Sequence, residues 1–335
     1  MYYPDTHEDL LTFCTVTGFP TLDPQMVRLQ QPDASVLLRD NIGAMMARCS
    51  LWWRATPPHH IERVGVIGHY AVRDAEAATA LLTFACEYLA EQGCTLAIGP
   101  MDGTTWQRYR LVTEQGSEPP FFLEPDTPLE WVNHFAAVGF NEIACYTSAL
   151  NPDLATTTRQ VRGWRVMDRL ARHGINLRAI TADMLASDEC YRLMLQRIYA
   201  VALQSFQRNP FFTPISLDAF VAQYLPLRPY LHPGLIWTAE HMGRVIGFCF
   251  ALPDVLQAQR GRPIDTVIIK TVAVLPEYEG QGIGVLLTDL CQQTAIGLGY
   301  QRAIHALMHE SNSSQNISTR TGSTIRRYAL FGKAL

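Results

Sequence analysis

The chain has 335 residues, which is more than one ordinary domain needs and enough for two. Hydrophobic residues make up 48% and charged residues 17%, so the chain can bury a sizeable core and is not a disordered protein. The formal net charge is -4 without a basic run, which gives no electrostatic footprint for nucleic acid or for an anionic membrane surface.

The cysteines and the apolar runs favour a cytoplasmic protein. The first residues lack a basic region followed by an apolar one, so we expect no signal peptide. The longest apolar run, Val245 to Leu252, is far shorter than the ~20 residues that cross a bilayer. The 8 cysteines are scattered without a CxxC pair, which favours buried, reduced thiols. His59-His60 has no matching cysteine cluster, so no metal site is expected.

The first half predicts a strand, a helix and a second strand. Val64 to Val72 is an apolar strand, Ala77 to Ala90 has helical periodicity, and the residues from Gln92 to Ile98 contain a short strand. Gly99 to Trp106 is a polar, turn-rich segment, for which we prefer a structural turn over a wall that faces substrate. A short helix is predicted over 131–138.

The middle of the chain reads as a connector followed by a strand and two helices. Asn151 to Gly174 has no long apolar run and is compatible with a helix through Val166 and Leu170. A strand is predicted over 175–180 and a helix over 190–206. Ser216 is a plausible N-cap for a shorter helix.

The last part predicts a hairpin joined to a strand–helix–strand unit. Residues 235–240 and 244–251 form the hairpin, and Thr266 to Val274 is a nearly continuous apolar strand, as in strands buried on both faces. A helix over 282–296 and a strand over 303–308 follow. This order matches that of the first half, which predicts a diverged internal duplication: a lobe over 1–150, a connector over 151–174 and a second domain over 175–335.

The segment from Val272 to Gly284 carries the chemistry. Glycines at 280, 282 and 284 let the backbone approach a ligand closely at the start of a helix. With the positive end of the helix dipole behind them, their N–H groups can hold a pyrophosphate. The spacing is neither a P-loop nor a complete GxGxxG, so the residues alone leave two interpretations open: a phosphate cradle or a tight strand-to-helix turn.

The run Val-x-Pro-Glu-Tyr-x-Gly-x-Gly-Ile-Gly, which begins at Val274, resembles motif A of the GCN5-related N-acetyltransferases, the GNAT superfamily. The resemblance covers 175–335 well and roughly 35–150 weakly. It implies an α/β fold with mixed α+β sheets and two tandem GNAT-like acyl-CoA N-acyltransferase folds. The first copy is degenerate, because its equivalent loop, Arg73 to Ala77, has no glycine and two acids. We therefore expect one CoA site.

The resemblance also implies where acetyl-CoA, or another acyl-CoA, would bind. The pantetheine arm would pair with the strand before the loop, and a backbone N–H near Val274 would polarise the thioester carbonyl. Glu279 departs from the Arg or Gln usual in the family and is expected to weaken CoA affinity. The implied CoA-binding residues are Val272, Ala273, Val274, Glu279, Gly280, Gln281, Gly282, Ile283, Gly284, Asn312 and Ser314.

Acid and base candidates depart from the family as well. The family's strand carboxylate is missing, and the nearest titratable side chains are His305 and His309, which alternate onto one face of the next strand. A structural histidine is the competing interpretation. Ser318 falls where the family has its tyrosine acid, which leaves Tyr328 as a weaker substitute. Lys270, alone in an apolar strand, either binds an acidic group of the substrate or reaches a cleft mouth.

These features predict a cytoplasmic N-acetyltransferase that moves an acetyl or other acyl group to an amine by direct attack in a ternary complex. The expected partner is a small-molecule amine acceptor, with no metal, nucleic acid or membrane involved, and the sequence specifies no oligomeric state. Aromatic residues at Phe206, Phe211, Phe212 and Trp237 point either to a small or partly apolar acceptor or to positions in the core. The alternative is a non-catalytic acyl-CoA-binding or sensory protein.

Overall fold

The computed structural model describes residues 7–157, 164–310 and 322–335. Within these residues, 12 strands form one mixed sheet in the order β1-β2-β3-β4-β12-β6-β11-β10-β9-β8-β7, while β5 pairs with β12 off this path. The strands are β1 (Ala34–Arg39), β2 (Met45–Trp52), β3 (Val64–Val72), β4 (Leu96–Gly99), β5 (Leu111–Glu114), β6 (Asn141–Asn151), β7 (Ile175–Ala179), β8 (Ile236–His241), β9 (Arg244–Pro253), β10 (Thr266–Val274), β11 (Arg302–His309) and β12 (Ser323–Ala334).

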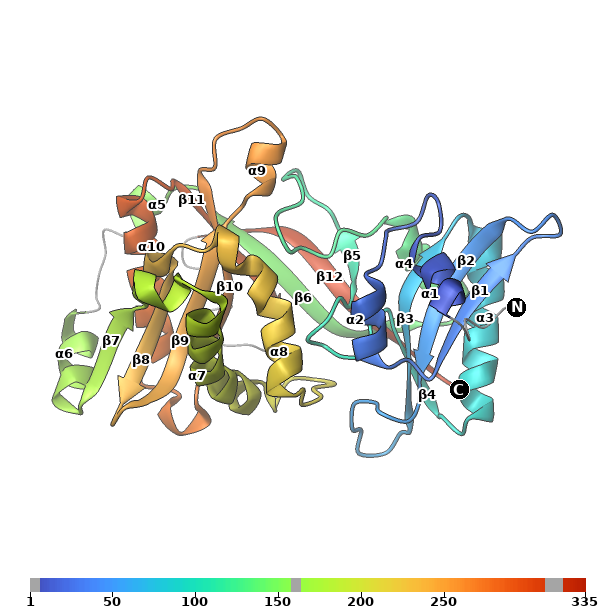
Figure 1. Ribbon diagram of the computed structural model, residues 1–335, viewed down its shortest axis with the longest axis horizontal. Helices are drawn as coiled ribbons and strands as arrows, with labels where there is room; N and C mark the ends of the chain where they lie inside the picture. Colours follow the sequence, from blue (N-terminus) through green and yellow to red (C-terminus); the bar gives the residue numbers. More distant parts are fainter. Residues whose placement is uncertain (1–6, 158–163, 311–321) are drawn as a thin grey trace.

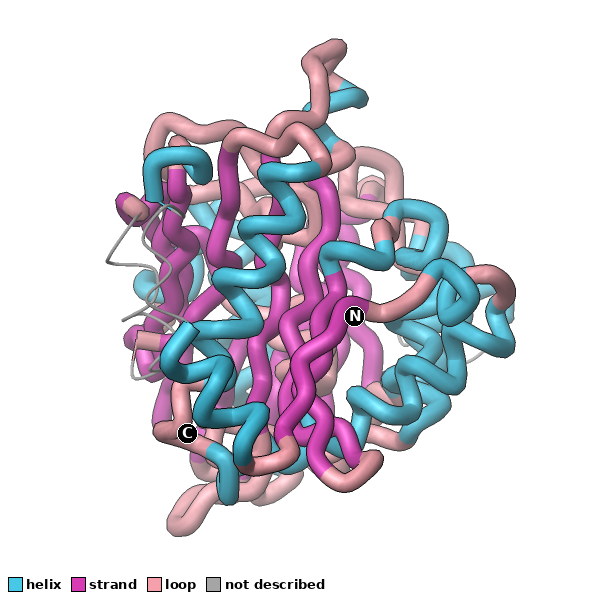
Figure 2. Tube along the Cα trace, turned by 90° about the vertical axis from the view of Figure 1, so that its left-hand side faces the viewer, coloured by secondary structure: helices cyan, strands magenta, loops and turns pink. Residues whose placement is uncertain are grey.

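Helices lie on the outside of the sheet, which runs through the interior (Figure 2). Short 3₁₀ turns occur at Ala182–Leu185, Leu225–Tyr230, Pro233–Leu235 and Pro276–Tyr278. The α-helices of the described residues are α1 (His7–Cys14), α2 (Pro24–Gln30), α3 (Ala75–Glu91), α4 (Glu130–Ala137), α5 (Leu154–Thr157), α6 (Trp164–Arg172), α7 (Asp188–Phe206), α8 (Leu217–Tyr224), α9 (Leu256–Gln259) and α10 (Ile283–Gly297).

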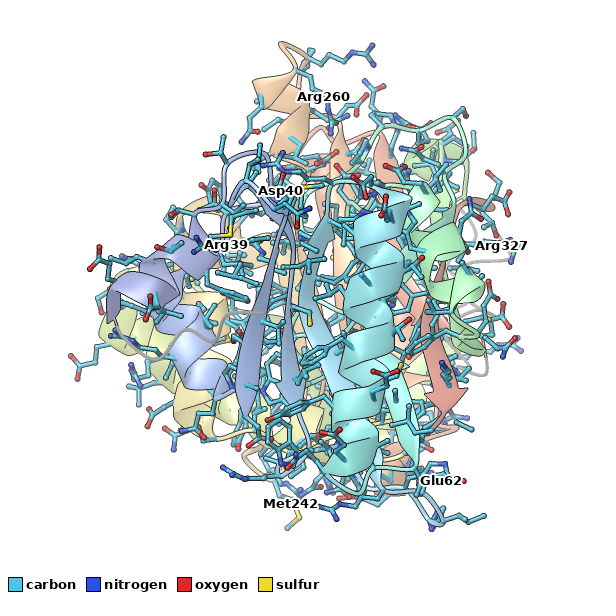
Figure 3. The ribbon with its side chains drawn as sticks, turned by 90° about the vertical axis from the view of Figure 1, so that its right-hand side faces the viewer. Arg39, Asp40, Glu62, Met242, Arg260 and Arg327 are labelled. Carbon is cyan, nitrogen blue, oxygen red and sulfur yellow. The ribbon has the colours of Figure 1, made fainter. Side chains whose placement is uncertain are left out.

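The two halves repeat one architecture. In the first, β2 pairs antiparallel with β3, and β3 pairs parallel with β4 across the helix α3. In the second, β9, β10, α10 and β11 repeat that order and those directions. Figure 3 shows α3 lying over the strands of the first half. The predicted strands over 64–72 and 266–274 have the predicted bounds, and the internal duplication is confirmed.

The last strand of each half lies in the other half. β6, which ends the first half, pairs antiparallel with β11 of the second, and β12 pairs antiparallel with β4 of the first. β6 and β12 also pair with each other, and Figure 1 shows them crossing together between the two lobes. The sheet is therefore continuous across residue 150, which is the domain boundary that the sequence predicts. The division of the chain at that residue stays a prediction.

Local sequence features explain a turn, a helix cap and a helix in and next to the second half. Met242 and Gly243 both have positive φ (50° and 79°), which is the backbone of a two-residue hairpin turn between β8 and β9. Ser216 caps α8 as predicted, because its side chain accepts a hydrogen bond from Ala219 N. The predicted connector contains α6, which spans Val166 and Leu170.

The core is divided between the lobes. One apolar cluster joins α7, β9, β10 and α10 in the second half, and another joins β2, β3 and α3 in the first. All 8 cysteines are free thiols, and six of them are buried. Among the described residues, no helix is long and apolar enough to cross a membrane.

Candidate active site

β10 and β11 separate halfway along their length. They pair in parallel only from Thr266 and Arg302 to Ile269 and His305. On β10, Lys270 is an extra residue relative to β9. On β11, the register with β6 shifts between His305 and Met308, and Leu307 has a φ of 58°. The two irregularities bend the strands apart and open a V in the middle of the sheet.

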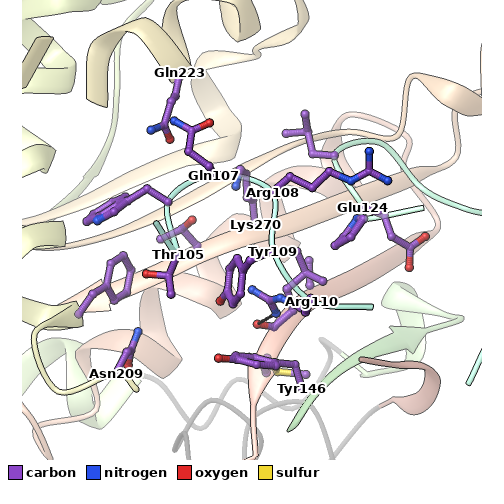
Figure 4. Close-up of a pocket in the computed structure, with 18 of the residues that line it drawn as sticks. Thr105, Gln107, Arg108, Tyr109, Arg110, Glu124, Tyr146, Asn209, Gln223 and Lys270 are labelled. Carbon is purple, nitrogen blue, oxygen red and sulfur yellow. Dashed lines mark hydrogen bonds between the residues drawn. The ribbon is translucent and has the colours of Figure 1, made fainter. Parts of the chain in front are cut away.

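A cavity of about 620 Å³ occupies this V. Its volume is in the range of small-molecule sites, roughly 300–1,000 Å³. β10 and β11 form its floor, α8 and the chain after α7 form one wall, and a loop of the first half forms another (Figure 4). Chemistry-bearing residues among those that line it are Gln107, Arg108, Tyr109, Arg110, Glu124, Tyr146, Asn209, Gln223, Lys270, His305 and His309.

The wall from the first half is a hairpin-like loop over 101–109. Met101 and Tyr109 form a β-bridge at its base. At its tip, Trp106 Nε1 donates to Thr213 O at 2.8 Å, and the Trp106 ring packs edge-on against Phe206 and Phe212. The segment over 99–106 is thus a structural turn, as preferred from the sequence, and it lines the pocket as well.

The glycine loop lies at the start of α10. Gly280 and Gly282 have φ values of 76° and 82°, which L-residues with side chains rarely adopt. Gly282 is the N-cap of α10 and brings no side chain to the helix end. The Leu286 N–H donates to Gly282 O, so the N–H groups ahead of it are available to a ligand. This geometry permits the phosphate cradle that the spacing left open.

Two arginines flank the loop. Arg169 of α6 donates from Nη2 to Gln281 O at 2.7 Å. Arg208, just after α7, forms an ion pair with Glu279 in which Nη1 and Oε2 are 3.4 Å apart. Both arginines add positive charge beside the helix N-terminus, and Arg208 offsets the carboxylate that the sequence places there. Ile283 is buried behind the loop.

The end of β10, just before the loop, contributes residues both to the contact with α10 and to the pocket lining. Val272 and Val274 turn toward α10, because their side chains lie 3.5 and 3.6 Å from the Cβ position of Gly284. Val272 also lines the pocket, whereas Ala273 is buried. The Val274 carbonyl accepts a hydrogen bond from Ser205 Oγ at 2.8 Å, a contact that the sequence did not indicate. Asn312 and Ser314 lie outside the described residues.

Both predicted histidines lie in the pocket. His305 is buried, and burial lowers the pKa of its imidazole to about 4. Its Nε2 lies 2.9 Å from Gln292 Nε2 of α10. His309 is half-buried and packs edge-on against the ring of Tyr146, with 5.0 Å between ring centroids. Burial lowers the pKa of His309 as well. Two neutral imidazoles therefore face the cavity near pH 7.

Tyr328 is not among the residues that line the cavity. Its hydroxyl donates to Glu124 Oε1 and lies 3.1 Å from Ser148 Oγ. Arg326 pairs with the same carboxylate, with Nε and Oε1 2.8 Å apart. Burial raises the pKa of Tyr328, which keeps its proton on the phenol. The structure therefore places Tyr328 in a buried polar network behind the pocket.

The cations that line the pocket come from both halves. Lys270 lies on β10, while Arg108 and Arg110 lie on the first-half loop. The sequence marked Lys270 by its isolation in an apolar strand. It carried no signal for the arginines, because only the packing of the lobes brings residue 110 next to residue 270. Among the described residues, no three His, Cys, Asp or Glu side chains gather as in a metal site.

The corresponding V of the first half is closed. Past the paired part of β3, Met101 N donates to Ile67 O at 2.8 Å, and His69 N donates to Asp102 Oδ1 at 2.6 Å. A Cβ at Gly68 would lie 2.0 Å from Met101 O, so the plugging chain contacts the strand directly. At the start of α3, the side chain of Asp74 accepts from Ala77 N and occupies the position that a phosphate would take.

The comparisons with known proteins agree with this architecture. Residues 195–317 match the Acetyltransferase (GNAT) family. This part of the chain is therefore a GNAT domain, which confirms the resemblance seen in the glycine motif. No curated protein matches the sequence.

Solved structures resemble nearly the whole chain. Eis1 from Mycobacterium abscessus has a TM-score of 0.52 and 12% identity, covering 100% of this chain and 72% of that one. A GCN5-related N-acetyltransferase from Anabaena variabilis has a TM-score of 0.50 and 11% identity, covering 99% and 72%. A fungal GH3 β-N-acetylglucosaminidase with a GCN5-related glucosamine N-acetyltransferase region has a TM-score of 0.52 and 16% identity. The match covers 97% of this chain, which spans 36% of the length of the fungal protein.

At these identities the likeness shows the fold alone. Together with the repeated strand order, it confirms the predicted fold class: an α/β protein with a mixed sheet and two tandem GNAT-like folds.

Proposed function

We propose that the protein is an acyl-CoA-dependent N-acyltransferase that moves an acetyl group, or another acyl group, from CoA to an amine of a small acceptor. The observation that carries this proposal is the open V between β10 and β11 beside the glycine loop. The same V in the first half is closed by Met101 and Asp102. The site is therefore specific to the half that matches the GNAT family.

Acyl-CoA would contact this chain at two places. Its pyrophosphate would lie on the backbone N–H groups around Gly280 and Gly282, with Arg169 and Arg208 adding positive charge nearby. Its pantetheine arm would run along the unpaired edge of β10 toward the cavity. The Ser205 hydroxyl already occupies the Val274 carbonyl, so the arm would use other backbone groups of that edge or displace this contact.

The chemistry requires one proton acceptor and a polarised carbonyl. The amine nitrogen attacks the thioester carbon, the carbon–sulfur bond breaks, and the CoA thiolate leaves and takes up a proton. Because burial lowers the pKa values of His305 and His309, both imidazoles are neutral and can accept the proton of the attacking amine. His309 is the more accessible of the two, since it is half-buried and His305 is buried.

A second candidate function is a non-catalytic acyl-CoA-binding protein. Two contacts favour it: His305 is held by Gln292, and Tyr328 is held by Glu124 and Ser148. Side chains bound in this way need to reorganise before they transfer a proton to or from a substrate. Binding of acyl-CoA is common to both candidates, and turnover separates them.

The first test is calorimetric titration of the full chain with acetyl-CoA, followed by CoA release with a panel of primary amines. We expect saturable binding of one acetyl-CoA per chain and amine-dependent release. His309→Ala should lower kcat by about 100-fold or more, the usual contribution of a general base. His60→Ala, at an exposed position away from the pocket, is the matched control.

The outcomes separate the candidates. The absence of saturable binding at millimolar acetyl-CoA would rule out both of them. Binding without release above background hydrolysis would favour the non-catalytic protein. If neither His309→Ala nor His305→Ala changes kcat, neither histidine is the general base. Transfer would then depend on positioning of the two substrates alone.

A further inference from the structure

A half-buried lysine lines the pocket without a carboxylate partner. Lys270 is one of two lysines in the chain, and it occupies the extra position of the β10 bulge. Its Nζ lies 5.9 Å from the centroid of the Tyr224 ring. Burial lowers the pKa of Lys270 to about 8, and the charge of Arg110 acts in the same direction. No ion pair joins Lys270 to an acid of the described residues.

Arg110 is a second cation in the same cavity, and it is buried. Its guanidinium carbon lies 3.8 Å from the centroid of Tyr109 and 3.9 Å from that of Tyr146, so the group is held between two rings (Figure 4). Nη1 makes a long contact with Leu307 O at 3.4 Å, and the buried Nε has no hydrogen-bond partner in the described part of the chain. Two tyrosine faces orient the guanidinium and leave its Nε without a hydrogen-bond partner.

The carboxylate that lines the cavity does not balance these charges. Glu124 is the acid among the described lining residues, and Arg326 and Tyr328 both bind its Oε1. Its Oε2 accepts from Phe121 N at 3.0 Å. The pocket therefore carries the uncompensated charge of Lys270 and Arg110. Burying an unpaired cation is costly, and a ligand that brings an anion removes that cost.

Lys270 lies at the bulge in the middle of β10, whereas the glycine loop follows the end of that strand. Lys270 faces α8 through Tyr224, whereas Val272 and Val274 face α10, which begins at the loop. The pocket wall above Lys270 also holds Gln223, whose buried Nε2 has no hydrogen-bond partner among the described residues. The phosphates of CoA would lie at the loop beyond the end of β10, whereas an anion held by Lys270 and Arg110 would lie inside the cavity, which we assign to the acceptor.

We propose that the acceptor is an amine that also carries a carboxylate, and that Lys270 and Arg110 together bind this carboxylate. The inference rests on the proposed function, because it names the class of the amine that the same site would acylate. An Arg donates two parallel hydrogen bonds to a carboxylate, and a lysine adds a point charge. With its carboxylate held there, the molecule would leave its amine end free to reach a thioester carbonyl placed in the same V.

The test measures binding of matched amines to the protein saturated with free CoA, so that no turnover occurs. The pairs are γ-aminobutyrate with butylamine and phenylalanine with phenethylamine. We expect the carboxylated member of at least one pair to bind about tenfold more tightly or better, as charge-assisted hydrogen bonds predict. Lys270→Met and Arg110→Met, which keep bulk and remove charge, should each abolish that preference. Lys333→Met, at the chain's other lysine, should keep it.

Three results would overturn the inference. The first is that no carboxylated amine binds to the wild-type protein at millimolar concentration. The second is that the preference survives in both Lys270→Met and Arg110→Met. The third is that succinyl-CoA binds more tightly than acetyl-CoA in a manner that depends on Lys270, because the anion would then belong to the acyl group.

A control separates this inference from the proposed function. Acetyl-CoA is titrated into the wild type and into each variant. If the wild type does not bind acetyl-CoA, the result contradicts the proposed function itself. Intact acetyl-CoA binding without a carboxylate preference contradicts only the class of acceptor.

Discussion

Lys270 is the residue at which stability and function oppose each other most clearly. Its neighbours on β10, Ile268 and Ile269, are buried and apolar, and β9 beside them is buried along most of its length. A methionine would fill the same space without a charge. Natural proteins keep such destabilising residues where activity needs them, so the lysine points to a ligand rather than to the core.

Replacing Lys270 with methionine should stabilise the protein. The pKa of Lys270 falls from an ordinary 10.5 to about 8 in the folded chain, which corresponds to roughly 3 kcal/mol in the free energy of unfolding near pH 7. Between pH 8 and 10.5 the unfolded chain binds the proton and the folded chain does not, so wild-type stability rises with pH there. The advantage of the variant should therefore be full below pH 8 and shrink as the pH increases above it.

Urea unfolding at several pH values between 7 and 10 measures this difference. The Lys333→Met variant corrects for the titration of other groups. A constant gap between Lys270→Met and the wild type across that range would show that the lysine is not held charged in an unfavourable environment.

The two halves differ in the residue that caps the N-terminus of the central helix. α3 begins with Asp74, whose carboxylate binds the helix's own N–H groups, whereas α10 begins with Gly282 and leaves them open. This contrast is visible in the sequence, because N-cap chemistry is local. The V beside each helix is not visible there. Bulges at Lys270 and Leu307 and the plug at Asp102 depend on which strands lie next to each other.

Gly280→Ala should weaken acetyl-CoA binding by about tenfold, the loss of one hydrogen bond to a charged group. Gly280 has a φ of 76° and nothing within 4 Å of its Cβ position, so the added methyl group would extend into open space beside the proposed pyrophosphate position. Gly243→Ala is a matched control, with a φ of 79° and equally open space in the β8–β9 turn. Both variants carry the same backbone strain, of roughly 1–2 kcal/mol.

Calorimetry gives the affinity for acetyl-CoA, and thermal unfolding gives the cost in stability. Equal losses of stability with a loss of affinity only in Gly280→Ala would support the loop as the pyrophosphate site. Unchanged affinity in Gly280→Ala would contradict it.

At the scale of the whole molecule, the exchanged strands join the two lobes into one unit. Without the second half, β4 loses β12 and β6 loses both β11 and β12. Without the first half, β11 and β12 lose β6 in turn. Each isolated half would expose unpaired strand edges, which favour aggregation over folding.

We therefore expect the full chain to unfold in a single cooperative transition, in which circular dichroism and tryptophan fluorescence coincide. Fragments 1–151 and 152–335, produced separately, should each lack a cooperative transition and should regain one when refolded together. A fragment 152–335 that folds and binds acetyl-CoA alone would show that the exchanged strands are dispensable.

The sequence by itself determined the repeated strand–helix–strand order, the bounds of β3 and β10, and the glycine loop at the start of α10. These features depend on local periodicity, backbone propensity and capping, which a chain carries without its neighbours. It also singled out Lys270, because a charge in an apolar strand is visible without a structure.

Only the tertiary structure decided that the last strands are exchanged, that the first V is closed, and that Arg110 lies beside Lys270. The physical reason is that each of these depends on contacts between residues far apart in the chain. The energies of such contacts leave no periodic trace in the sequence.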